Sequence, residues 1–200
     1  KRVTLELGGN DAGIVLDDAV PAEAAAGIFR SAFSNSGQVC VALKRLYVQE
    51  RIYDAVVDEL AKLANQAVVG DGSEQGVQFG PVQNKAQFER VKDLLEDARK
   101  HGKVAAGGEI LDRPGYFIRP TIVRDIADGT RLVDEEQFGP LLPVNKYRGV
   151  DEAVRLANAS SYGLGGSVWS SDTKRAVEVG QRLECGSLWI NKHGDLAANI

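Results

Sequence analysis

The chain has 200 residues, 44% of them hydrophobic and 26% charged, which is enough for one domain with a sizeable core. Its formal net charge of −4 provides no basic field, so we expect neither nucleic acid nor an anionic membrane surface as a partner. No apolar run approaches the length of a membrane-spanning helix.

Apolar runs alternate with stretches of helical periodicity along the chain. Pro21 suits the first turn of a helix, and Ile52, Val56 and Leu60 recur at the spacing that makes one apolar helix face. In chain order we predict a strand over 12–16, a helix over 21–35, a strand over 43–49, a helix over 51–67, a glycine-rich loop over 70–81, a helix over 83–101, a strand over 104–106, an apolar run over 141–147, a helix over 151–158, a strand over 166–169, a helix over 173–183 and a strand over 187–191.

This alternation predicts the α/β class, with a mostly parallel sheet between two helical layers in a three-layer α/β/α arrangement. No internal repeat, low-complexity tract or Pro/Ser-rich linker divides the chain, so we expect residues 1–200 to form one domain. Sheets of this kind often bind nucleotides. The chain has no Gly-x-Gly-x-x-Gly loop between a strand and a helix and no Gly-x-x-x-x-Gly-Lys-Ser/Thr loop, so its own residues do not indicate a dinucleotide-binding domain.

Two short runs carry most of the chemical information. Residues 5–10 read Leu-Glu-Leu-Gly-Gly-Asn and place the Glu6 carboxylate beside a flexible glycine pair. Residues 33–40 read Phe-Ser-Asn-Ser-Gly-Gln-Val-Cys and place the Cys40 thiol among small, uncharged residues. A thiolate can attack a carbonyl carbon, and a carboxylate can then activate the water that releases the acyl group. The pair indicates acyl chemistry through a cysteine intermediate.

Both runs, and their separation, resemble the glutamate and cysteine signatures of the aldehyde dehydrogenase superfamily. The resemblance continues through residues 117–122 (Phe-Ile-Arg-Pro-Thr-Ile), through the Glu-Glu-Gln-Phe-Gly-Pro run at 135–140, and through residues 158–169, which include Tyr-Gly-Leu. These motifs cover essentially the whole chain in the family's order. The resemblance implies the family's catalytic domain and a small aldehyde as substrate.

The resemblance implies that Cys40 is the nucleophile and that Glu6 activates the hydrolytic water. Without that context, Cys40 reads equally well as a buried structural cysteine, and Glu6 reads as a strand-end residue. Glu6 lies between two leucines, where a carboxylate holds its proton more tightly, and this suits a general base near neutral pH. Superfamily members that pass the acyl group to coenzyme A generally lack this glutamate, so release of a free carboxylic acid is favoured.

The cofactor implied by the resemblance is NAD or NADP. Glu136 would hold the ribose hydroxyls of the nicotinamide half, and Phe138 would pack beside the nicotinamide ring. Leu7 and Gly8, next to the general base, are assigned to the same cofactor. The alternative for Glu136 and Phe138 is a charged helix end followed by a core aromatic residue.

The chain contains no Met, and the Glu6 run begins almost at its first residue, so we expect a piece of a longer protein. The resemblance implies a preceding dinucleotide-binding domain and a following oligomerisation segment, and a parent protein that is a homodimer or homotetramer. Two cysteines far apart in sequence, Cys40 and Cys185, indicate a reduced, cytoplasmic protein rather than a disulfide framework.

Three alternatives remain open. The parent could be a semialdehyde or pyrroline-carboxylate dehydrogenase of the same superfamily, or a structural homologue that keeps the fold without the reaction. A cysteine hydrolase would need a histidine paired with Cys40. His101 reads as a cation at a helix C-terminus, and His193 lies in a turn-like setting where it could contact substrate. With only these two histidines we expect no metal site, and we interpret Cys185 as structural.

Overall fold

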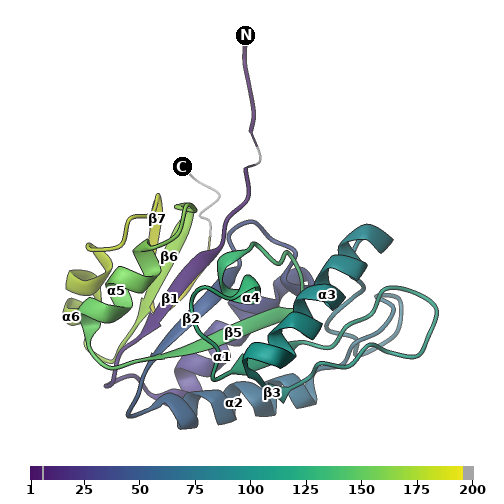
Figure 1. Cartoon of the computed structure of the whole chain (residues 1–200), viewed down its shortest axis with the longest axis horizontal. Helices are drawn as coiled ribbons and strands as arrows, with labels where there is room; N and C mark the ends of the chain where they lie inside the picture. The colour runs from purple at the N-terminus through teal and green to yellow at the C-terminus, as the bar shows by residue number, and fades with distance from the viewer. Residues whose placement is uncertain (6, 196–200) are drawn as a thin grey trace.

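The computed structural model describes residues 1–5 and 7–195 and contains one seven-stranded sheet with the order β3-β4-β5-β2-β1-β6-β7. Five of the six strand pairs are parallel, and only β3 and β4 are antiparallel. The strands are β1 (Asp11–Val15), β2 (Leu43–Gln49), β3 (Lys103–Ala106), β4 (Thr121–Arg124), β5 (Leu141–Tyr147), β6 (Gly165–Trp169) and β7 (Ser187–Ile190). The predicted mostly parallel α/β sheet is confirmed (Figure 1).

Helices cover both faces of the sheet. They are α1 (Pro21–Phe33), α2 (Tyr53–Gln66), α3 (Lys85–His101), α4 (Arg131–Asp134), α5 (Val150–Asn158) and α6 (Thr173–Gly180). The helices α1 and α2 pack on one face through a shared cluster of buried side chains, while α3 with α4 and α5 with α6 form two clusters on the other. None of the helices in the described part of the chain is long and apolar enough to cross a membrane.

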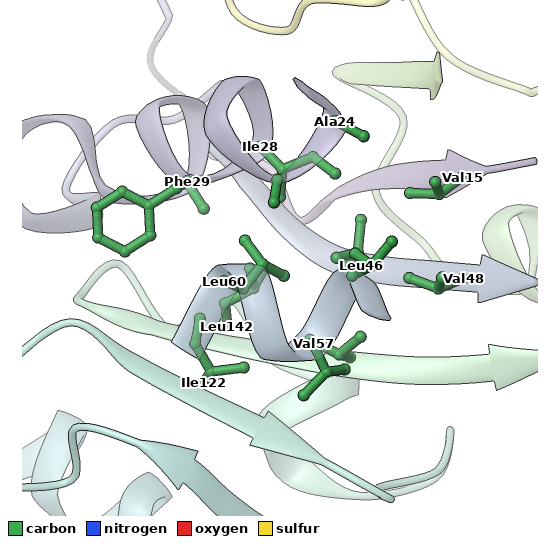
Figure 2. Packing of buried hydrophobic residues seen from close by; sticks show 14 of the residues in the cluster. Val15, Ala24, Ile28, Phe29, Leu46, Val48, Val57, Leu60, Ile122 and Leu142 are labelled. Carbon is green, nitrogen blue, oxygen red and sulfur yellow. The ribbon is translucent and has the colours of Figure 1, made fainter. Parts of the chain in front are cut away.

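Alternation along the strands builds these layers. On β1, Ile14 packs with α5 and α6 while the next residue, Val15, packs with α1 and α2. On β4, Ile122 and Val123 divide in the same way between the α2 side and the α3 side. Figure 2 shows the α1–α2 side, where side chains of both helices meet those of the strands beneath them. A strand buried on both faces reads as a continuous apolar run because neither face is exposed to water.

The predicted elements are present, with ends that shift by a few residues. The helix predicted to begin at residue 83 begins at Lys85, because the Asn84 side chain accepts a hydrogen bond from the backbone N–H of Gln87 and caps it. Two elements were missed, the strand β4 and the one-turn helix α4. Each has only four residues, too few for a periodic pattern, and neither adjoins a glycine turn as the equally short β3 and β7 do at Gly107 and Gly186.

The two chemical runs and the Glu-Glu-Gln-Phe-Gly-Pro run come together because of strand direction. Gly9 lies two residues before β1, Cys40 three residues before β2 and Phe138 three residues before β5. These three strands are mutually parallel neighbours in the order β5-β2-β1, so the segments that enter them lie at one edge of the sheet. Open α/β sheets usually bind ligands at the carboxyl ends of their strands, whereas these residues gather at the amino ends.

Candidate active site

The segment that carries Cys40, which we call the nucleophile segment (residues 34–40), has an unusual backbone. After α1 ends at Phe33, Asn35, Ser36 and Gly37 take positive φ angles of 51°, 56° and 73°. Residues with a Cβ atom are sterically strained at positive φ, and such strain is concentrated at functional sites. The left-handed turn reverses the chain after α1, and half-buried Cys40 follows it in the loop before β2.

The glycine pair of the first run contacts both of the other segments. A Cβ atom on Gly9 would lie 2.6 Å from the carbonyl oxygen of Cys40, so the two backbones touch. Gly8 has a φ of 75°, and a Cβ atom there would lie 2.5 Å from Oε2 of Glu136. The Gly9 N–H donates to Oε1 of Glu136 over 3.2 Å. The pair therefore joins the cysteine to the carboxylate that was assigned to the cofactor.

The second strained segment, which we call the cofactor loop (residues 136–140), is held from helix α3. Phe138 has a φ of 46°, which is rare for an aromatic residue. The Gln87 side chain donates to the carbonyl oxygens of Gln137 and Phe138 over 2.7 and 3.1 Å. Arg90 donates to the carbonyl oxygen of Glu136 over 3.1 Å. The loop thus keeps a costly conformation because α3 satisfies its backbone.

A hollow of about 750 Å³ opens between these segments. It is lined by five of the residues assigned from the sequence, namely Leu7, Gly8, Cys40, Glu136 and Phe138. The general-base candidate Glu6 lies outside the described residues. The structure therefore brings the nucleophile candidate together with every described cofactor candidate, although their roles stay predictions.

Five further residues line the hollow: Gln38, Val39, Gln87, Arg90 and Tyr162. Gln38, Val39 and Tyr162 lie inside runs already singled out, so those runs contained a signal for them. Gln87 and Arg90 lie on α3, where nothing in the sequence separates them from other polar residues on a solvent-facing helix. Glu135, the neighbour of the cofactor candidate Glu136, is half-buried and pairs with Arg90 and Arg131 at 3.2 and 2.8 Å.

One buried cation lies behind the site. Lys44 is 2% exposed, and its Nζ donates to the carbonyl oxygens of Ala32 and Gly139 over 3.2 and 2.7 Å. Burial lowers the pKa of Lys44 to about 7, and the negative charge of Glu136 opposes part of that shift. The charge balance of the site therefore includes a lysine that titrates near neutral pH.

His193 lies in the loop after β7, in keeping with the turn-like setting expected for it, and its side chain is buried beneath the nucleophile segment. Its Nε2 lies 2.9 Å from the carbonyl oxygen of Val41 and 3.3 Å from Oδ2 of Asp11, and its Nδ1 lies 3.0 Å from Oγ of Ser167. Trp169 donates to the same Ser167 oxygen, so its hydroxyl hydrogen is free for Nδ1. With a hydrogen on Nε2, the ring donates to the Val41 carbonyl oxygen and accepts from the Ser167 hydroxyl, while Oδ2 of Asp11 has no hydrogen-bond partner among the described residues.

The remaining candidates keep their structural interpretation. His101 is the last residue of α3, with Nδ1 2.9 Å from the carbonyl oxygen of Asp97, and neither histidine ring contacts Cys40 among the described residues. The Cys185 thiol donates to the carbonyl oxygen of Ser187, and burial raises its pKa. In the described ranges, no three His, Cys, Asp or Glu side chains are grouped as metal ligands.

Comparison with known proteins identifies the family. The aldehyde dehydrogenase family matches residues 1–200. Phenylacetaldehyde dehydrogenase of Pseudomonas fluorescens is 41% identical over the whole chain, and succinate-semialdehyde dehydrogenase (NADP+) of Deinococcus radiodurans is also 41% identical. The chain spans 40% and 42% of the lengths of these two relatives. The NAD+ complex of an aldehyde dehydrogenase from Bacillus cereus matches with a TM-score of 0.94 and 41% identity, over 99% of this chain and 40% of that one.

Proposed function

The chain belongs to the aldehyde dehydrogenase family, and from this premise we propose that the whole protein oxidises an aldehyde to a carboxylic acid with NAD or NADP. The observation that carries the proposal is the shared hollow, in which Cys40 lies with Glu136 and Phe138 between two strained segments. Cys40 is separated from Glu136 and Phe138 by about a hundred residues in the sequence, so only the folded chain brings them together.

Cys40 attacks first. Its thiolate adds to the aldehyde carbon, and the carbonyl oxygen takes the negative charge as the C–S bond forms. In this proposal the backbone N–H of Cys40 donates to that oxygen, as an oxyanion-hole donor does. The carbon then loses a hydride, and the adduct becomes a thioester on Cys40.

The residues around Gly8 fit a nicotinamide cofactor. A glycine with a positive φ lets the cofactor approach the backbone, and the Glu136 carboxylate directly beside it can accept hydrogen bonds from a pair of ribose hydroxyls. Phe138, half-buried in the same hollow, supplies an aromatic wall. When bound, the cofactor supplies the acceptor for the hydride.

Glu6 completes the reaction in this proposal. Its carboxylate takes a proton from water, the resulting hydroxide adds to the thioester carbon, and the C–S bond breaks to release the acid and the Cys40 thiolate. His193 does not take this role, because its ring nitrogens already bond to Val41 and Ser167. A cysteine–histidine hydrolase mechanism therefore has no support from the geometry.

A second candidate substrate class is a semialdehyde, with the same chemistry at Cys40. The chain is 41% identical to a succinate-semialdehyde dehydrogenase, which supports this class. Its identity to a phenylacetaldehyde dehydrogenase is also 41%, so identity does not separate the two classes. Pyrroline-carboxylate dehydrogenases share the same mechanism. The proposal therefore specifies the reaction, and the activity test described next identifies which aldehyde is the substrate.

The test uses the longest natural protein that contains this segment. NAD(P)H formation is measured with alkyl, aryl and carboxylated aldehydes for the wild type, Cys40→Ala and Glu6→Gln. We expect Cys40→Ala to abolish turnover and Glu6→Gln to give one burst of NAD(P)H per site, because acylation proceeds and hydrolysis does not. A Cys40→Ala protein with wild-type turnover would contradict the proposal.

A further inference from the structure

Strand β2 carries one extra residue at its start. Its pairing with β1 matches Asp11 to Leu43 and Ala12 to Arg45, which leaves Lys44 without a partner on β1. Such a bulge turns the side chain of the extra residue in a direction that regular pairing does not allow, and bulges recur next to active sites. Here it directs a lysine into the protein interior, where the side chain is fully buried.

The Lys44 side chain ends where three segments meet. Nζ donates to the carbonyl oxygen of Ala32, in the last turn of α1, and to that of Gly139, next to Phe138. Gly37 of the nucleophile segment completes the junction, since a Cβ atom there would overlap both Nζ and the Gly139 carbonyl oxygen. One nitrogen atom thus contacts the backbone on both sides of the candidate active site.

An apolar residue at position 44 would avoid the cost of burying an amine. What lysine supplies instead is several N–H donors on one atom at the end of a long side chain. Even the uncharged amine keeps two N–H groups, which is enough for both carbonyl oxygens. The contacts therefore do not depend on the charge of Lys44.

We propose that Lys44 is a positioning residue that fixes the nucleophile segment relative to the cofactor loop. The inference rests on the proposed function, because the two segments carry the thiol and the cofactor-binding side chains. Hydride transfer needs the acyl carbon and the acceptor at a close, aligned separation, and a displacement of about 1 Å can cost about a hundredfold in rate. By holding both the cofactor loop and the last turn of α1, from which the nucleophile segment continues, Lys44 sets that separation.

The experiment compares wild type, Lys44→Met and Lys174→Met in the longest natural protein. Lys174 is an exposed lysine on α6, and it controls for the loss of a charge. The measurements are kcat, KM for NAD(P), the deuterium isotope effect with aldehyde labelled on the carbonyl carbon, and the rate at which iodoacetamide alkylates Cys40, followed on its peptide by mass spectrometry.

We expect Lys44→Met to lower kcat at least about tenfold and to raise the isotope effect, because hydride transfer becomes slower than the other steps. Lys174→Met should match wild type. A stabilising role alone would lower the melting temperature and leave the isotope effect unchanged. A folded Lys44→Met with wild-type kcat and isotope effect would overturn the inference.

If Lys44→Met does not fold, Lys44→Gln takes its place. The amide keeps two N–H donors on a side chain one methylene shorter, so it can hold one carbonyl oxygen and not both. We expect a smaller loss of kcat with the same rise in isotope effect. A folded Lys44→Gln that matches wild type in both would overturn the inference equally.

The alkylation rate separates this inference from the proposed function. If the wild type forms no NAD(P)H with any aldehyde, the proposed function fails, and the Cys40 rate still reports on the nucleophile segment. A change of about fivefold or more in Lys44→Met would support Lys44 as its anchor, since thiol reactivity follows local environment. An unchanged rate in such a protein would overturn it.

Discussion

Nε2 of His193 lies 2.9 Å from the carbonyl oxygen of Val41, the residue that follows the candidate nucleophile. The two residues are 152 positions apart in sequence. The contact attaches Val41 to the segment that follows β7. The Gly9 backbone touches the carbonyl oxygen of Cys40 from another direction. The candidate nucleophile is therefore held between segments from the two ends of the chain.

This contact predicts that His193→Phe, which keeps a ring and loses both nitrogens, destabilises the protein by about 1–3 kcal/mol, because buried hydrogen-bonding groups of Val41 and Ser167 lose their partner. His101→Phe is the control, since that side chain is 49% exposed. Denaturant unfolding measures both. Equal stability of the two variants would show that the buried contacts of His193 contribute nothing.

Gly8→Ala should weaken cofactor binding and leave the fold intact. Its φ of 75° strains any other residue, and a Cβ atom would displace the Glu136 carboxylate that lies 2.5 Å away. We expect KM for NAD(P) to rise about tenfold or more, with little change in melting temperature. Gly72→Ala, where a Cβ atom meets nothing within 4 Å, should leave KM at the wild-type value.

Lys44 should make stability depend on pH above neutrality. Burial disfavours the charged form of Lys44 and lowers its pKa from the ordinary lysine value of 10.5 to about 7 in the folded protein. Between these values the unfolded chain holds a proton that the folded chain lacks, so the free energy of unfolding rises with pH, by up to about 1.4 kcal/mol per pH unit. The stability gained in this way is fully lost below pH 7.

The comparison of wild type with Lys44→Met isolates this effect, since all other titrating groups are shared. Urea unfolding midpoints at pH 7, 8 and 9 should climb more steeply for wild type than for the variant. Parallel curves would mean that Lys44 keeps an ordinary pKa in the folded protein.

The two cysteines should differ in reactivity. Burial, helped by the negative charge of Asp11, raises the pKa of Cys185, so less of its thiolate is present at pH 7–8. We expect iodoacetamide to modify Cys40 first, in the native protein at pH 7.5. Peptide mass spectrometry over a time course measures both sites, and faster modification of Cys185 would contradict the assignment. Cys185→Ala should keep wild-type kcat.

Sequence patterns predicted the longer elements because local periodicity reflects burial. The apolar run at 12–16 and the apolar face of the helix at 51–67 are consequences of packing that each segment shows by itself. The four-residue strand β4 was not predicted, because a pattern so short has no period and no glycine turn adjoins it. The resemblance of the runs at 5–10 and 33–40 led directly to Cys40 and Gly8, both of which line the hollow.

By itself, then, the sequence determined the α/β class, the family and the residue types available for the chemistry. Only the tertiary structure decided which other side chains contact the candidate catalytic residues and hold their segments in place. Nothing local distinguishes His193 from a turn histidine or Lys44 from a surface lysine, because their burial depends on carbonyl groups supplied by segments far along the chain. Strand direction in the sheet brings those segments to one edge, and that direction is a property of the whole fold.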